Sequence, residues 1–156
     1  MEIMKNPGIA IDHIRLIKSH VEMVAPDGKR EFNLKLEGLG RFESKDGKEL
    51  TLHAAFDVMH GVEKPLFKFT CEFIAKYVRR EETSMDWKDF SSAMALAHII
   101  PYLREYVSNI TNRLPAPVLM LDPINTHAMI ADFEERSRRV AASNTSGKPS
   151  VPADEG

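Results

Sequence analysis

The sequence predicts an α+β fold in which a four-stranded antiparallel sheet, arranged as a meander, is followed by two C-terminal helices. Two observations support this prediction. The first half of the chain contains four segments with the composition or the alternation of a strand, separated by turn signals. From about residue 86 onward, apolar residues recur three and four positions apart, which is the spacing of one helix face. Helices that come only after all the strands indicate an α+β order.

The first two strands are expected on either side of a turn. Residues 9–24 are rich in β-branched residues, which favour strands. The alternation changes parity between Leu16 and Val21, and this predicts a bulge between them. A Pro-Asp-Gly turn signal follows at residues 26–28, and residues 32–37 then alternate as a half-buried second strand should.

Two more strands follow as hairpins. The Asp-Gly pair at residues 46–47 is typical of a tight hairpin turn, and residues 50–58 carry an apolar residue at every second position. After a break between Gly61 and Pro65, residues 67–77 show the clearest alternation in the chain. The apolar members of this stripe are Phe67, Phe69, Cys71, Phe73, Ala75 and Tyr77.

The remaining chain predicts two helices and a tail. A long amphipathic helix contains Pro101, and a second helix is expected to begin at Asp122 and Pro123 and to end near Val140. Acidic and basic residues four apart, such as Asp132 with Arg136, indicate a solvated face on this second helix. The apolar face of the long helix comprises Phe90, Ala93, Met94, Ala97, Ile100, Leu103, Val107, Ile110 and Leu114.

The composition predicts one soluble domain over residues 1–142 and a disordered polar tail over residues 143–156. Of the 156 residues, 43% are hydrophobic, which is enough for a core. The net charge of -2 lacks the basic excess that nucleic-acid binding requires, so we expect no nucleic-acid partner. No stretch approaches the ~18 apolar residues of a membrane span, so we expect no membrane insertion. The single Cys71 excludes an internal disulfide, and without a signal-peptide pattern we expect a cytoplasmic protein.

The sequence carries no motif for catalysis. His13 and His20, like His53 and His60, are seven residues apart on strands and point to opposite faces, so we expect no metal site. Cys71 lies on an apolar stripe without a neighbouring base that could activate it. Phosphate-binding loops and nucleophile elbows are absent from the sequence. We therefore expect no enzymatic activity and no cofactor, although a catalytic site could still assemble from dispersed residues.

Apolar surface is the remaining feature, and it predicts contacts with other chains. The strand at residues 67–77 and the long helix together offer more apolar surface than one face of a four-stranded sheet covers. We therefore expect a homo-oligomer, most simply a tetramer. Residues 115–123 form a proline-bounded apolar loop, which either packs on its own sheet or presents a rigid apolar wall to another chain. The residues expected at the oligomer interface are Phe69, Cys71, Phe73, Leu103 and Val107.

Four segments resemble one family. Residues 99–105 read Ile-Ile-Pro-Tyr-Leu-Arg-Glu, and residues 119–125 read Leu-Met-Leu-Asp-Pro-Ile-Asn. They resemble the Leu-Phe-Pro-Tyr-Ala-Arg-Glu of the bacterial export chaperone family SecB and its leucine-rich loop, which ends in Pro-Val/Ile-Asn-Phe. Residues 14–26 are similar to the opening strand of that family, and residues 69–73, Phe-Thr-Cys-Glu-Phe, are similar to its Phe-Leu-Cys-Glu-Val. The likeness runs in the same order from about residue 11 to residue 133.

The resemblance implies a chaperone that assembles as a dimer of dimers and holds unfolded clients in hydrophobic grooves without ATP. Members similar to SecB include solitary chaperones tied to toxin–antitoxin pairs, whose client is an antitoxin tail. The client of this chain would accordingly be a preprotein or an antitoxin. By position, the resemblance implies peptide-binding roles for Leu34, Leu36, Leu119, Leu121, Ile130 and Phe133.

The chain departs from the family pattern at the contact with the translocase motor SecA. The first strand of SecB carries acidic residues for this contact, whereas His20 and Val24 stand at those positions here. Glu72 keeps the acidic residue of the fourth strand. We therefore expect weak binding to the motor or none. Two other classes remain open from the residues alone: an adaptor that binds one folded partner, and an enzyme with a dispersed site.

Overall fold

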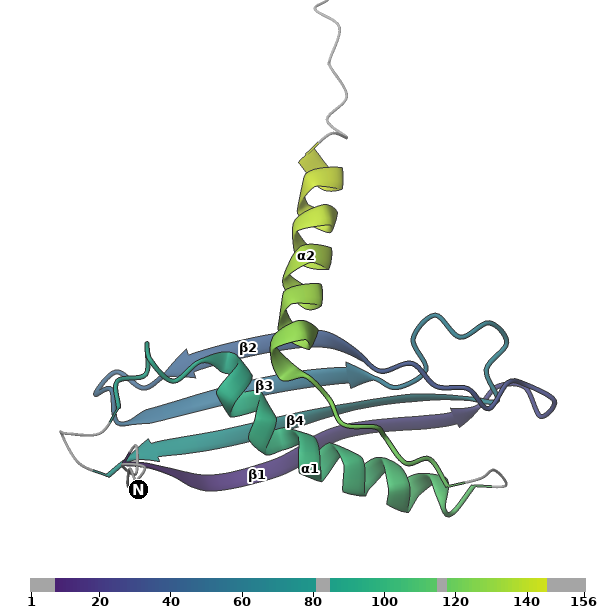
Figure 1. Cartoon of the computed structure of the whole chain (residues 1–156), viewed down its shortest axis with the longest axis horizontal. Coiled ribbons are helices and arrows are strands. Elements are labelled where there is room, and N and C mark those ends of the chain that lie inside the picture. Colours follow the sequence, from purple (N-terminus) through teal and green to yellow (C-terminus); the bar gives the residue numbers. More distant parts are fainter. Residues whose placement is uncertain (1–7, 81–84, 115–117, 146–156) are drawn as a thin grey trace, which may run out of the picture.

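The described residues form a four-stranded antiparallel sheet and two helices that follow it in the chain (Figure 1). The computed structural model describes residues 8–80, 85–114 and 118–145. The predicted α+β order is confirmed. The elements are β1 (Ile9–Met23), β2 (Lys35–Glu43), β3 (Glu49–Asp57), β4 (Phe67–Arg79), α1 (Ser92–Thr111) and α2 (Thr126–Thr145).

The strand order is β1-β4-β3-β2, so only part of the sheet is the predicted meander. Strands β2, β3 and β4 pair in sequence order, but β1 pairs with β4 rather than with β2. The chain between β1 and β2 crosses the ends of β4 and β3, where Lys29 N–H donates to the Lys64 carbonyl at 2.9 Å. At Gly28 an added Cβ would lie 2.6 Å from Leu66 N, so the crossing requires a glycine. The turn at residues 26–28 therefore leads into a crossover and not into a hairpin.

Strand β1 is irregular, as its sequence predicted. Its pairing with β4 shifts register between Ile11 and His13 and again between Leu16 and Lys18. The second shift lies within the interval where the parity of the apolar residues changes, so the predicted bulge is confirmed. Bulges bend a strand and increase its twist. The long edge strand can therefore curve along the whole of β4.

The core lies between one face of the sheet and α1. Every second residue of β4 is buried, which confirms the alternation that predicted this strand. The Tyr77 hydroxyl donates to the Ala95 carbonyl at 2.7 Å and so joins the buried face of β4 to α1. Helix α1 begins after Ser91, whose side chain accepts from Met94 N–H at 3.1 Å. Fully buried residues include Leu36, Leu52, Phe56, Phe69, Leu96, Ile99, Leu103 and Val107.

Helix α2 starts later than predicted and projects away from the sheet (Figure 1). The chain does not turn into a helix at Pro123; instead the Asn125 side chain accepts from Ala128 N–H at 3.0 Å and caps the first turn. The buried Thr126 hydroxyl donates to the Ala93 carbonyl at 3.1 Å, which fixes the start of α2 on α1. The helix continues to Thr145, and the rest of the expected polar tail, residues 146–156, lies outside the described residues. Neither described helix is both long and apolar enough to cross a membrane.

Candidate peptide-binding groove

An open groove of about 560 Å3 lies where α2 rises beside β2. Strand β2 contributes residues at its N-terminal end, and α2 contributes a stripe of apolar and basic side chains. Because β2 is an edge strand of the described sheet, the backbone groups on its outer edge lack a neighbouring strand. The groove thus combines side-chain surface with an edge strand of the sheet. It is lined by Lys35, Glu37, Phe133, Arg136, Ser137, Arg139 and Val140.

Arg136 holds the two walls of the groove together. Its Nη2 donates to the Leu36 carbonyl at 2.8 Å, and its Nε donates to Asp132 Oδ2 at 2.9 Å. The guanidinium carbon also lies 5.9 Å from the centre of the Phe133 ring, a distance at which cation–π attraction operates. The pairing of Asp132 with Arg136 was predicted, but the arginine reaches the sheet and does not belong to a purely solvated helix face.

Three cationic side chains line the groove, and the carboxylates that pair with two of them lie outside it. Lys35 Nζ is 3.5 Å from Glu37 Oε1, and both residues line the groove. Arg139 pairs with Glu135 on the same helix, and Glu135, like Asp132, is outside the lining. A ligand entering the groove therefore meets three cationic side chains and one carboxylate.

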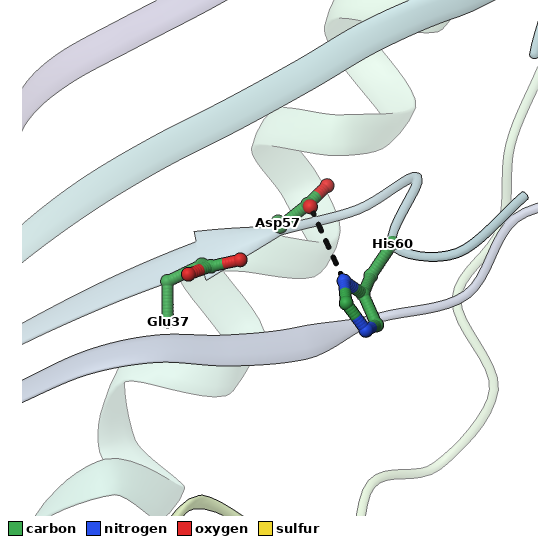
Figure 2. A group of neighbouring side chains, drawn as sticks. All are labelled: Glu37, Asp57 and His60. Carbon is green, nitrogen blue, oxygen red and sulfur yellow. Dashed lines mark ion pairs between the residues drawn. The ribbon is translucent and has the colours of Figure 1, made fainter. Parts of the chain in front are cut away.

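A cluster of titratable side chains adjoins the groove at the end of β3 (Figure 2). Glu37, Asp57 and His60 come from β2, β3 and the following turn, and their potential metal-ligating atoms lie within 4.8 Å of one another. Met59 N–H donates to Asp57 Oδ1 at 2.9 Å, and Asp57 Oδ2 lies 3.7 Å from His60 Nδ1. Lys35 Nζ lies 3.5 Å from His60 Nδ1 as well as from Glu37, so an ammonium already supplies positive charge at the cluster. The sequence did not predict this grouping because its members come from three separate segments.

The six residues implied to bind peptide do not form one open surface. Phe133 lines the groove, whereas the side chains of Leu36 and Leu121 are buried in the core. Leu34, Leu119 and Ile130 are partly buried and pack against that core. Leu36 still contributes to the groove, because its carbonyl receives Arg136.

The loop before α2 is tied to α1, and the leucines of this loop face inward. Leu119 N–H donates to the buried Thr111 hydroxyl at 2.8 Å, which ties the loop to the end of α1. Residues of an extended segment alternate in direction, so Leu121 points into the core while Val118 and Met120 point outward, with 44% and 66% of their surface exposed. Both interpretations of the loop hold in part: alternate residues pack down, and the others present apolar surface.

The residues expected at an oligomer interface are covered by the chain itself. Phe69, Cys71 and Phe73 on β4 face Leu103 and Val107 on α1, and none of the five is more than 3% exposed. The expectation failed because α1 and the segment just before it cover the apolar stripe of β4. Any contact between copies of the chain must use other side chains.

The residues at positions where the resemblance to SecB implies contact with the motor SecA lie on or near the surface. His20 is exposed on β1, and Val24, just after this strand, is also exposed. Glu72 on β4 is half-buried, forms an ion pair with Lys18 at 3.8 Å and is hydrogen-bonded to His53 at 3.2 Å. The one carboxylate retained at these positions is therefore already engaged with two neighbours.

Cys71 lacks the character of a nucleophile. Burial raises the pKa of its thiol to about 12, with a smaller contribution from the charge of Glu72. At neutral pH the group is a protonated thiol, and a thiol reacts only as its thiolate. The core position of Cys71 between sheet and helix agrees with a small apolar side chain.

Phe133 is the one groove residue that sequence reasoning proposed as a peptide contact, and the six that it missed are Lys35, Glu37, Arg136, Ser137, Arg139 and Val140. Helical periodicity could have found two of them, because Phe133, Arg136 and Val140 stand three and four positions apart. The position of Lys35 depends on how β2 meets α2, a contact between distant segments that no local pattern reveals.

Comparisons with known proteins identify the fold. No protein-family model matches the sequence, and no curated protein sequence matches it. The SecB-like chaperone Rv1957 of Mycobacterium tuberculosis, solved in complex with a ChAD peptide from the Rv1956 HigA1 antitoxin, aligns with a TM-score of 0.58 and 19% identity over 74% of this chain and 90% of that chain. A protein of unknown function from Streptococcus agalactiae aligns with a TM-score of 0.45 and 11% identity over 74% of this chain and 97% of that chain. With its four antiparallel strands followed by two helices, the chain has the fold of the SecB-like chaperones.

Proposed function

We propose that this protein is an ATP-independent chaperone that holds unfolded or unstructured polypeptides in the groove between β2 and α2. The observation that carries the proposal is the groove itself, where Phe133 and Val140 lie beside the free edge of a strand. Exposed apolar surface next to an edge strand suits an extended chain. The fold shared with a chaperone solved with an antitoxin peptide supports the proposal.

Such a chaperone acts by mass action. It binds the unfolded chain and not the folded one, so it keeps the client soluble without a chemical step. A client segment would place apolar side chains against Phe133 and Val140, and its backbone could hydrogen-bond to the outer edge of β2. Because holding a client requires no chemical reaction, the proposed function needs no catalytic residue.

The experiment that tests this proposal is suppression of aggregation without nucleotide. A chemically denatured model protein is diluted into buffer with and without the chain, and light scattering follows its aggregation. We expect slower aggregation at near-stoichiometric chaperone and no binding to the same model protein in its folded form. Binding to a folded protein without protection of unfolded ones would contradict the proposal and favour a dedicated adaptor.

For the client, we infer an antitoxin segment in preference to a preprotein on its way to export. The relative in fold was solved with an antitoxin peptide. His20 and Val24 occupy the positions where the resemblance to SecB implies acidic contacts with the motor, and Glu72 is paired with Lys18 and His53. The absence of a carboxylate at two of these positions reduces the attraction to a basic motor segment.

We also propose that the chain forms a homo-oligomer, a tetramer built as a dimer of dimers, through the free edge of β1 and the outer face of α1. Ile11, Leu16 and Ile17 on β1 and Tyr102 on α1 are all exposed large apolar side chains. A second hollow, of about 210 Å3, lies between these two elements. The free edge of a long strand beside apolar side chains suits pairing with a second copy.

Replacing Ile17 and Tyr102 together by lysine is expected to convert the oligomer into a monomer, because buried, unpaired ammonium groups oppose association. Size-exclusion chromatography with light scattering measures the mass at micromolar concentration. The matched control is Phe42→Lys on the opposite edge strand, where an apolar side chain is also exposed, and it should leave the mass unchanged. A parent protein that is already monomeric would refute the proposed assembly.

A further inference from the structure

We propose that the groove selects client segments in which carboxylates accompany apolar side chains, and that Arg139 is the main residue that makes this selection. The inference rests on the proposed function, since it names the class of peptide that the groove between β2 and α2 would take. It follows from which charges line the groove, which of them can change partners, and how the apolar side chains are spaced between them.

The first step is the sign of the charge that a client meets. Lys35, Arg136 and Arg139 line the groove, and Glu37 is the single carboxylate among its described lining residues. Asp132 and Glu135, which pair with the two arginines, are not part of that lining. Like charges brought together across an interface are unfavourable, whereas opposite charges strengthen both attraction and specificity. A basic client segment would therefore be disfavoured at this surface and an acidic one favoured.

The second step is the availability of each cation. Arg136 is committed to the fold, because it donates to the Leu36 carbonyl and to Asp132 at the same time. The Lys35 side chain is only 17% exposed and lies against Glu37. Arg139 differs, since its side chain is 75% exposed and its described ion-pair partner is Glu135 on the same helix. Exposed pairs of this kind contribute little stability, so Arg139 can exchange Glu135 for a client carboxylate at small cost.

The third step is the apolar spacing. Phe133 and Val140 lie on the same side of α2, and seven residues of helix separate them by about 10 Å along the axis. About three residues of an extended chain span the same distance. Arg139 stands next to Val140 at the outer end of this span. A client that follows α2 would therefore match the groove with two apolar residues two or three positions apart and an acidic residue beside the second.

The test uses three labelled peptides with the same two apolar residues, flanked by aspartate and glutamate, by lysine, or by uncharged glutamine. Fluorescence anisotropy measures their dissociation constants in low salt with the parent protein. We expect the acidic peptide to bind about five- to tenfold more tightly than the basic one, with the uncharged peptide between them. The difference should shrink as salt is raised toward 1 M, because salt screens exposed charges.

Variants at position 139 assign the effect to one side chain. Arg139→Glu should abolish or reverse the preference, and Arg139→Gln should reduce it, each measured as the ratio of the dissociation constants of the basic and the acidic peptide. The control is Lys88→Glu, which changes an exposed lysine paired with Asp86 outside the groove and should leave the preference intact.

The outcomes separate this inference from the proposed function. If all three peptides bind equally to the parent, or if Arg139→Glu keeps the acidic preference, charge selection is refuted and the groove remains a peptide site. If none of the peptides binds, both the inference and the proposed groove are refuted. Binding of the basic peptide above the acidic one would overturn the inference directly.

Discussion

Replacing Leu103 with alanine is expected to lower the free energy of unfolding by about 3 kcal/mol. Leu103 is completely buried on the face of α1 that covers the sheet. Removing a buried leucine side chain loses its transfer free energy and leaves a cavity, and such changes cost roughly 2 to 5 kcal/mol. Equilibrium unfolding in urea, followed by circular dichroism, measures the difference.

The neighbouring residue supplies the control for this prediction. Tyr102 is 47% exposed on the outer face of the same helix, so Tyr102→Ala should cost less than about 1 kcal/mol at protein concentrations where the parent is monomeric. If Leu103 instead served a contact between copies, Leu103→Ala would change the oligomer mass and spare the stability of the monomer. That pattern would contradict the assignment of Leu103 to the core.

Replacing Phe133 and Val140 together by serine is expected to weaken client binding at least tenfold. Both side chains line the groove, and Val140 is among the most exposed large apolar residues described. Full burial of a side chain of this kind contributes about 1.5 to 3 kcal/mol, so loss of two partly buried contacts should cost about 2 kcal/mol. Each 1.4 kcal/mol corresponds to a factor of about ten in the dissociation constant. Titration with a denatured client and the aggregation assay both report the loss.

A second pair of apolar residues distinguishes the groove from general surface hydrophobicity. Val24 and Met94 are also exposed, but neither lines the groove, so Val24→Ser with Met94→Ser should bind clients as the parent does. Circular dichroism must show that both double variants keep their helix content. Equal losses in the two variants would mean that clients bind without using this groove.

The strands could be predicted because their information is local. The alternation over residues 67–77 marks β4, and the change of parity near Leu16 marks the bulge in β1. The place of β1 in the sheet could not be predicted in this way. Its pairing with β4 joins Ile9 to Arg79, and the pattern of each strand is the same whichever neighbour it has. A turn signal at residues 26–28 favours a hairpin, yet the chain that follows it is long enough to cross the sheet end.

The structure shows where the residues implied to bind peptide lie, and their roles stay predictions. Phe133 was placed correctly on the helix wall of the groove, although its peptide-binding role stays a prediction. The resemblance to SecB implied client contacts for Leu119 and Leu121, but alternation along the extended loop turns these two side chains toward the core and Met120 outward. Arg136 was read as a solvated partner of Asp132, because the local pairing is visible in the sequence and the contact with Leu36 is not.

The pairing of β1 with β4 has a consequence for folding on the ribosome. Strand β1 leaves the ribosome first, but β4, its neighbour in the sheet, is the last of the four strands to be synthesised. At about 5 to 20 residues per second, several seconds separate the appearance of Met23 from that of Arg79. During this delay β2 and β3 can already form their hairpin, whereas β1, with Ile11, Leu16 and Ile17, has no native neighbour. The complete four-stranded sheet can form only after this long-range contact, so its formation is slow. Until then, β1 stays open to pairing with other nascent chains.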